Sequence, residues 1–220
     1  GTVSKPATMA LLISAGGGGL LGGALWFATR RVEEHLARRE ALLLVAVSWF
    51  LGAAIAAMPY FLWAHLDESL VEYPFTSYID CYFEAMSGLT TTGATVLSDI
   101  HRLPPSLLLW RALTHWLGGL GIVVLFVAVL PSLGTGGKKL FRVEAPGPEK
   151  EGVRPHIRET ARILWYIYLG LTVVAILAIR ATGVMGWFES ICHALSLVST
   201  GGLSPKNASI GAYDSAMLDY

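Results

Sequence analysis

Charged residues are scarce in this sequence. Asp, Glu, Lys and Arg together make up 15% of its 220 residues, whereas a soluble domain usually carries about 25%. Hydrophobic residues make up 54%, and the mean hydropathy is +0.56. A chain this apolar and this poor in charge is not an ordinary soluble domain. The composition predicts an all-α protein that crosses a membrane several times.

The sequence also lacks an excess of charge of either sign. Its 16 Lys and Arg residues equal its 16 Asp and Glu residues, so no basic face for nucleic acid is indicated. Only two cysteines are present, and the spacing of Cys81 and Cys192 matches no zinc or redox motif. We therefore expect both thiols to be packing residues of the interior.

Motifs of enzymes are missing as well. The glycine run at 16–19 is followed by no Lys-Ser or Lys-Thr pair, so it is not a phosphate-binding loop, and we expect these glycines to allow close helix packing. No HExxH, GxSxG or paired-aspartate motif occurs. One enzyme hypothesis remains, an intramembrane site formed by Glu84, His115, Glu189 and His193. Without a motif to support it, we predict that the protein is not an enzyme and uses no organic cofactor.

Long apolar stretches are what the sequence does contain. A membrane-spanning helix needs about 20 residues, and stretches of this length lie at 7–29, 41–64, 106–130 and 160–182. Pro131 is expected to end the third of them. The stretches at 76–90 and 186–198 are helical in composition but too short to span.

The loops between these stretches differ in charge. Lys and Arg gather in 30–40 and 131–158, whereas 65–80 carries acidic residues and no Lys or Arg. The positive-inside rule therefore predicts that 30–40 and 131–158 face the cytoplasm and that 65–80 lies outside.

The stretch FEAMSGLTTTGATV, at 83–96, is unusual because it places polar, non-helical sequence between apolar spans. Irregular backbone at membrane depth is tolerated only where it is buried in protein or lines a water-filled path. A row of backbone carbonyl groups along such a path forms a cation filter. We call residues 90–95 the first Thr-Gly segment.

A second copy of this stretch follows later in the chain. The stretch ALSLVSTGGLS (194–204) aligns without gaps on AMSGLTTTGAT (85–95), which pairs Gly93 with Gly202, and we call this pairing the repeat alignment. A register one residue shorter pairs Gly93 with Gly201 but loses several other matches. A self-match at a fixed period indicates a duplicated structural unit. We call residues 199–204 the second Thr-Gly segment.

The sequence resembles the Trk/Ktr/HKT superfamily of potassium transporters, and most closely the TrkH-type membrane subunit. The matching stretches, in the family's order, are FEAMSGLTTTGATV, HWLGGLGIVVL with LPSLGTGG, VEAPGP, RETARILWYIYLGLT and STGGLS. The resemblance implies potassium-channel-like repeats of span, pore helix, filter loop and span, with one extra N-terminal span. Family members have four such repeats, so this chain corresponds to the N-terminal half. It also implies potassium as the transported ion, with filter residues Thr91, Thr92, Gly93, Thr200, Gly201 and Gly202.

The resemblance also predicts the organisation of the chain. The expected parts are a peripheral transmembrane helix with a cytoplasmic loop (1–39), a first complete repeat (40–135), a cytoplasmic connection (136–158) and a second repeat without its inner helix (159–220). It implies a multi-pass protein of the bacterial inner membrane. The implied partners are membrane lipid, a second copy in a homodimer and a cytoplasmic nucleotide-sensing ring protein.

Two other functions remain open at this stage. Some relatives place a serine at the filter glycine, and they form a sodium-selective or sodium-coupled alternative; glycine at both Gly93 and Gly202 favours potassium. A membrane scaffold that transports nothing is the alternative of another class, and the repeated Thr-Gly segment argues against it.

Single residues carry further expectations. Glu84 is expected to brace the first Thr-Gly segment by hydrogen bonds. Arg111 and His115 lie one helical turn apart, and both should face the protein interior because a charge facing lipid is costly. Gly118 is expected to lie away from the Thr-Gly segments, so that Gly118→Ser would leave ion selectivity unchanged.

Overall fold

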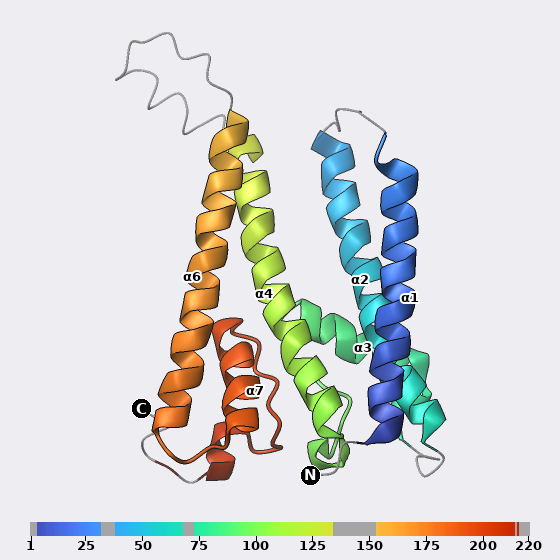
Figure 1. Cartoon of the computed structure of the whole chain (residues 1–220), viewed down its shortest axis with the longest axis vertical. Coiled ribbons are helices and arrows are strands. Elements are labelled where there is room, and N and C mark those ends of the chain that lie inside the picture. Colours follow the sequence, from blue (N-terminus) through green and yellow to red (C-terminus); the bar gives the residue numbers. More distant parts are fainter. Residues whose placement is uncertain (1–3, 32–37, 68–72, 134–152, 214, 216–220) are drawn as a thin grey trace.

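The computed structural model describes residues 4–31, 38–67, 73–133, 153–213 and 215. Every regular element in these ranges is a helix (Figure 1). The long helices are α1 (Lys5–Thr29), α2 (Arg38–Leu66), α4 (Pro105–Leu133) and α6 (Val153–Ala181). The all-α membrane fold expected from composition is confirmed, because Lys5–Thr29, Leu43–Leu66 and Glu159–Ala181 are long and apolar enough to cross a bilayer.

Two helix boundaries differ from the sequence prediction. α4 continues through Pro131 to Leu133, because a proline near a helix end removes only one hydrogen bond. α6 begins at Val153, inside the range expected to be a loop, and Pro155 is tolerated in its first turn, where backbone N–H groups have no helical partner. Most of the expected basic loop at 131–158 lies outside the described residues.

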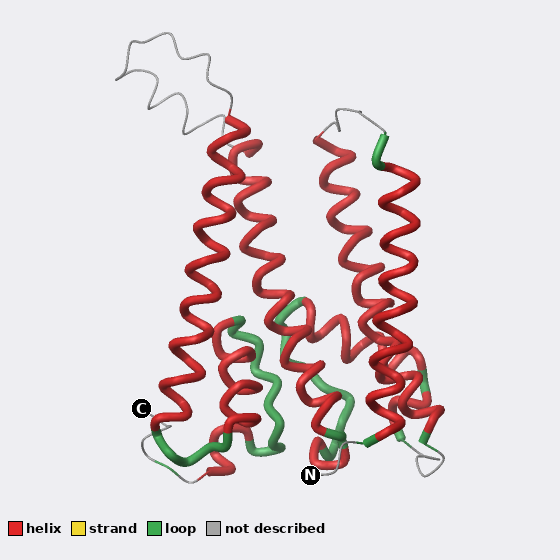
Figure 2. Tube along the Cα trace, in the orientation of Figure 1, coloured by secondary structure: helices red, strands yellow, loops and turns green. Residues whose placement is uncertain are grey.

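The two short helices lie on either side of α4. α3 (Tyr78–Leu89) packs between α2 and α4, and α7 (Trp187–Val198) packs between α4 and α6 (Figure 1). Figure 2 shows that the loops following α3 and α7 both run beside the same half of α4. The last turns of α1 and α4 and the first turns of α2 and α6 lie at the opposite end of the molecule. This arrangement agrees with a common side for loops 30–40 and 131–158; the assignment of that side to the cytoplasm stays a prediction.

Buried aromatic side chains position the start of α3. Tyr60 and Trp63 of α2 pack against Tyr73 and Phe75, with ring centroids 4.8–6.5 Å apart. Aromatic side chains of this size bury roughly 150–250 Å² each, so the cluster is a substantial part of this core. The Cys81 thiol donates to the Phe75 carbonyl at 3.2 Å. Cys81 and Cys192 are both fully buried, as expected for packing residues.

The glycine run of α1 packs less closely than expected. Only Gly18 has a neighbour near the position of a Cβ, the Ile55 side chain at 3.3 Å. A Cβ on the other glycines of this helix would meet nothing within 4 Å in the described part of the chain. α1 packs mainly on α2 and leaves the rest of its surface exposed. The prediction of close packing therefore holds at one glycine of the run.

Candidate functional site

The two Thr-Gly segments leave their helices by the same hydrogen bonds. α3 and α7 have equal lengths of 12 residues, and the repeat alignment pairs their first residues and their last residues. Two backbone N–H groups after each helix then donate to its last carbonyl groups at 2.9–3.0 Å. The pairs are Thr91 to Gly88 and Thr92 to Ser87 at α3, and Thr200 to Leu197 and Gly201 to Ser196 at α7. The repeat alignment therefore describes the backbone, and the register that pairs Gly93 with Gly201 does not.

The backbone of both segments alternates in handedness. Thr91 and Thr200 have φ values of 52° and 55°, and Gly93 and Gly202 have 77° and 87°. The residue between them, Thr92 or Gly201, has φ of the ordinary negative sign. Such alternation turns successive N–H groups to one side of the chain and successive carbonyl groups to the other.

The left-handed threonines were not predicted from sequence. A β-branched residue rarely takes positive φ, and the strain costs roughly 1–3 kcal/mol. Gly93 and Gly202 take their left-handed φ without steric cost, whereas Thr91 and Thr200 do not. Strain at two equivalent positions of a repeat is typical of a functional segment rather than of an ordinary loop.

The carbonyl oxygens of the six expected filter residues have no hydrogen-bond donor in the described part of the chain. Within the described ranges, no hydrogen bond ends on the carbonyl oxygen of Thr91, Thr92, Gly93, Thr200, Gly201 or Gly202. Thr92, Thr200 and Gly202 are exposed in this chain. The N–H groups at the start of each segment are bonded to the helix ends, while the carbonyl oxygens are left for another partner.

The fold brings the two segments into contact. A Cβ on Gly93 would overlap the Gly201 carbonyl oxygen, and the Gly201 and Gly202 backbone lies within 3.6 Å of the same position. Residues that are far apart in the sequence therefore lie side by side here. At Gly202 a Cβ would meet nothing within 4 Å in the described part of the chain.

A buried ion pair lies behind the first segment. Arg111 of α4 donates from Nε to Glu84 Oε1 of α3 at 2.8 Å, and its Nη2 forms a salt bridge with the same oxygen at 2.7 Å. Arg111 is 1% exposed and Glu84 is fully buried. Glu84 in turn accepts hydrogen bonds from Thr95 Oγ1 at 2.9 Å and from the Val96 N–H at 3.1 Å. The expectation that Glu84 braces the first Thr-Gly segment is confirmed.

Two serines at equivalent positions of α3 and α7 make different contacts. Ser87 Oγ donates to the Ala94 carbonyl at 2.6 Å and so holds the end of the first segment against α3. Its counterpart Ser196 lies 3.3 Å from Nδ1 of His115. Sequence reasoning did not single out either serine, although the pairing of Ser87 with Ser196 in the repeat alignment contained the signal.

The helix α4 also contacts the second segment. Arg111 Nη1 donates to the Ser204 carbonyl at 3.3 Å. The His115 ring lies directly behind Gly201, where an added Cβ would be 2.5–2.7 Å from three ring atoms. Arg111 and His115 are both buried, so the prediction that they face the interior is confirmed.

Gly118 does not lie away from this site. A Cβ on Gly118 would overlap the carbonyl group of Leu89, the last residue of α3. The neighbouring Gly119 is equally confined, by the Tyr168 hydroxyl at 2.6 Å and by Ser199 at 3.0 Å. The expected position of Gly118, away from the Thr-Gly segments, is wrong, because α4 crosses the ends of both short helices at these glycines. Unchanged ion selectivity in Gly118→Ser stays a prediction.

The four residues of the enzyme hypothesis do not assemble into one site. Glu84 is paired with Arg111, and Glu189 is paired with Lys206 at 3.2 Å. His115 contacts Ser196, whereas His193 lies against the Tyr213 ring, with ring centroids 5.8 Å apart. The described residues hold no group of three or more His, Cys, Asp or Glu side chains that fits a metal ion.

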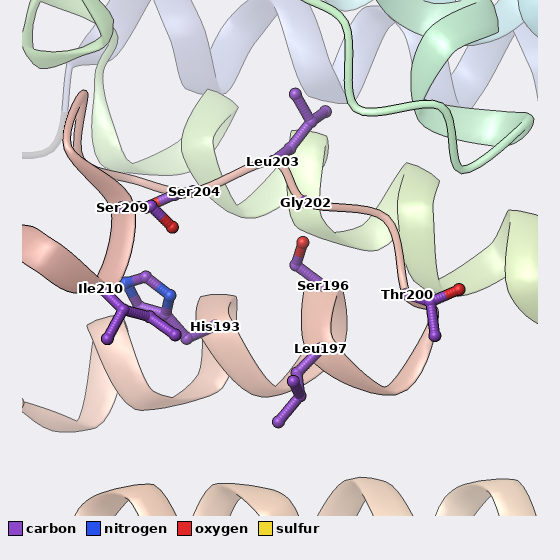
Figure 3. Close-up of a pocket in the computed structure, with 9 residues that line it drawn as sticks. All are labelled: His193, Ser196, Leu197, Thr200, Gly202, Leu203, Ser204, Ser209 and Ile210. Carbon is purple, nitrogen blue, oxygen red and sulfur yellow. The ribbon is translucent and has the colours of Figure 1, made fainter. Parts of the chain in front are cut away.

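A cavity of about 370 Å³ separates α7 from the second segment. It is lined by His193, Ser196, Leu197, Thr200, Gly202, Leu203, Ser204, Ser209 and Ile210. Figure 3 shows the Ser196 hydroxyl pointing from α7 toward this segment. His193, the counterpart of Glu84 in the repeat alignment, is buried, and its Nε2 has no hydrogen-bond partner among the described residues. The second segment is thus supported differently from the first.

The loops beyond the two segments are joined by one side chain. Asn207 Oδ1 accepts from the Ile100 N–H at 2.8 Å, and its Nδ2 donates to Asp99 Oδ1 at 3.4 Å. This link was not predicted from sequence, where Asn207 looks like an ordinary loop residue.

Comparisons with known proteins agree with this geometry. A sequence model of the family TrkH, cation transport protein, matches residues 18–219. The chain is 39% identical to "Trk system potassium uptake protein TrkH" of Salmonella typhimurium, and the match covers 100% of this chain and 46% of that protein. The protein of the same name from Halomonas elongata is 43% identical over 90% of this chain and 39% of its own length.

A solved structure shares the fold. The crystal structure of the potassium transporter TrkH from Vibrio parahaemolyticus matches with a TM-score of 0.79 and 34% identity, over 97% of this chain and 40% of that chain. The present chain thus spans about half the length of the relatives it matches. The family model covers most of the sequence and the fold agrees, so this chain belongs to the TrkH family of cation transport proteins.

Proposed function

We propose that this chain forms about half of the pore of a potassium uptake protein, with the two Thr-Gly segments as half of its selectivity filter. One observation carries the proposal: two segments paired by the repeat alignment share an alternating backbone and meet at Gly93 and Gly201, and within the described residues the same carbonyl oxygens of both accept no hydrogen bond. The ion sites are then formed by the carbonyl groups of Thr91, Thr92, Gly93, Thr200, Gly201 and Gly202.

The chemistry of these groups suits a monovalent cation. Carbonyl oxygens replace the water shell of a potassium ion as it enters a filter. Each Thr-Gly segment begins at the C-terminal end of a short helix, where the backbone carries roughly half a negative charge. Both helix ends therefore favour a cation beside the free carbonyl groups.

Potassium is favoured over sodium by the glycines. The left-handed φ of Gly93 and Gly202 is the conformation that glycine takes without steric cost. The relatives from Salmonella typhimurium and Halomonas elongata are named as potassium uptake proteins. A sodium-selective or sodium-coupled pore is the second candidate, and competition between the two ions distinguishes them.

Membership of a transporter family decides against the intramembrane enzyme. The chain is a multi-pass protein of the bacterial inner membrane, in contact with lipid along its apolar helices. We also propose the two partners that the family resemblance implies, a cytoplasmic nucleotide-sensing ring protein and a second copy in a homodimer. The relatives' names, which assign them to a Trk system, support a system of more than one component.

The test uses the full-length protein in a strain that is deficient in potassium uptake. Gly93→Ser and Gly202→Ser should each reach the membrane and each lose preference for potassium over sodium. A side chain is strained at the left-handed φ of both positions, and at Gly93 it also overlaps the Gly201 carbonyl oxygen, so carbonyl groups of the filter shift. Wild-type selectivity in both variants would overturn the proposal. Normal membrane insertion of the wild-type protein without any ion uptake would instead favour the scaffold.

A further inference from the structure

We propose that Arg111 and His115 are positioning residues for ion selectivity, which hold the second Thr-Gly segment in register with the first. The inference rests on the proposed function, since it concerns the geometry of the same filter. It assigns to α4, the helix that follows the first segment, a direct role in aligning the second.

The Arg111 guanidinium joins the two segments. On one side it donates to Glu84, which holds Thr95 and Val96 of the first segment and its continuation. On the other side it donates to the Ser204 carbonyl, at the end of the second segment. Nη2 also lies 3.3 Å from Thr95 Oγ1. Thr95 and Ser204 are paired in the repeat alignment, so one side chain contacts the same place in both segments.

His115 holds the second segment at its other end. Its ring packs against the α-carbon of Gly201, and its Nδ1 is 3.3 Å from Ser196 Oγ. Because Arg111 and His115 are one turn apart on α4, their contacts lie at the two ends of the stretch from Gly201 to Ser204. The position of this stretch is therefore set by α4.

Stability alone does not account for a buried pair of this kind. Removing Arg111 and Glu84 from water is costly, and such pairs can often be replaced by apolar side chains without loss of stability. An apolar replacement would lose the directed hydrogen bonds of this side chain. The three nitrogens of the planar guanidinium each donate to a different acceptor. The pair is better explained by positioning than by stabilisation.

Selectivity depends on this alignment because the segments touch. The Gly201 carbonyl oxygen lies against Gly93, so a shift of the second segment also moves carbonyl groups beside the first. Ion discrimination depends on the number and placement of these oxygens. Releasing either contact of α4 should thus change the preference between ions before it abolishes transport.

The experiment measures potassium uptake in competition with sodium, for full-length variants at matched membrane abundance. Arg111→Lys keeps the charge but cannot reach Glu84 and Ser204 together, and we expect the potassium-over-sodium ratio to fall roughly tenfold, as for the loss of one charged hydrogen bond. His115→Ala, which frees the Gly201 side, should also lower the ratio. Lys206→Gln is the matched control, because it breaks the partly exposed Lys206–Glu189 pair near the same segment and should leave the ratio unchanged.

The outcomes separate this inference from the proposed function. Wild-type ratios in Arg111→Lys and His115→Ala, together with lost selectivity in Gly93→Ser, would overturn the positioning role and leave the filter proposal intact. Wild-type ratios in Gly93→Ser and Gly202→Ser as well would overturn both. If Arg111→Lys fails to accumulate in the membrane, the potassium-over-sodium ratio of His115→Ala decides whether the positioning role holds. A role in folding only would predict less protein in the membrane with an unchanged ratio.

Discussion

The α-carbon of Gly93 lies against the carbonyl oxygen of Gly201, so closely that a Cβ on Gly93 would overlap this oxygen. The two residues are not equivalent in the repeat alignment, which pairs Gly93 with Gly202. The two Thr-Gly segments are alike in backbone but meet at non-equivalent residues. The equivalent glycines Gly93 and Gly202 therefore have different surroundings.

This difference predicts unequal effects of alanine at the two positions. Left-handed φ should cost either variant about 1–3 kcal/mol, but only Gly93→Ala also forces the Gly201 backbone to move. We expect Gly93→Ala to lower potassium uptake more than Gly202→Ala, measured as initial uptake rates at equal membrane abundance. Equal rates for the two variants would contradict the contact.

Substitution of Gly118 should destabilise the protein. Gly118→Ser places a side chain on the Leu89 carbonyl group, and overpacking of this kind costs about 1–3 kcal/mol. We expect a lower melting temperature in detergent and less protein in the membrane. The matched control is Gly170→Ser on α6, where a Cβ meets nothing within 4 Å. If both variants melt together with the wild type, the close approach of α4 to α3 is wrong.

The hydroxyl group of Thr95 should contribute more to stability than the size of its side chain. It donates to Glu84 and accepts from the Leu97 N–H. Thr95→Val keeps the shape of the side chain but removes one hydrogen-bond partner from the Glu84 carboxylate and one from the Leu97 N–H. We expect this loss to lower the free energy of unfolding by about 1–3 kcal/mol. Thr95→Ser retains the hydroxyl and should stay near wild type. Thermal unfolding of the purified variants checks this, and the expected order is wild type, then serine, then valine; a valine variant as stable as wild type would refute it.

The topology can be tested without removing the native cysteines. Cys81 and Cys192 are fully buried and should not react with a membrane-impermeant maleimide. We expect Ala208→Cys, beyond the second Thr-Gly segment, to be labelled in intact cells. Arg31→Cys, after α1, should be labelled only once the membrane is opened, because arginines near this position favour the cytoplasmic side. Labelling of both from outside would reverse this orientation.

Much of the fold can be predicted from short stretches of the sequence. Apolar length predicts the membrane-spanning helices, and short apolar stretches before Thr-Gly predict α3 and α7 to within a few residues. The repeat alignment predicts which backbone positions are equivalent, since similar residues after similar helices make the same turn. The cost of exposing a charge to lipid is enough to predict that Arg111 and His115 face inward.

Other features depend on how α4 crosses the two short helices. Gly118 and Gly119 look like neutral helix glycines in the sequence, but one contacts the end of α3 and the other contacts Ser199 after α7. The double contact of Arg111, with Glu84 and with the Ser204 carbonyl, joins positions 27 and 93 residues away along the chain. Periodicity and composition predict which residues are buried, but they do not predict which residues these pack against. The packing partners are decided by the crossing of helices that are distant in sequence. The left-handed φ of Thr91 and Thr200 also depends on tertiary structure, since such strain persists only where the surrounding packing imposes it.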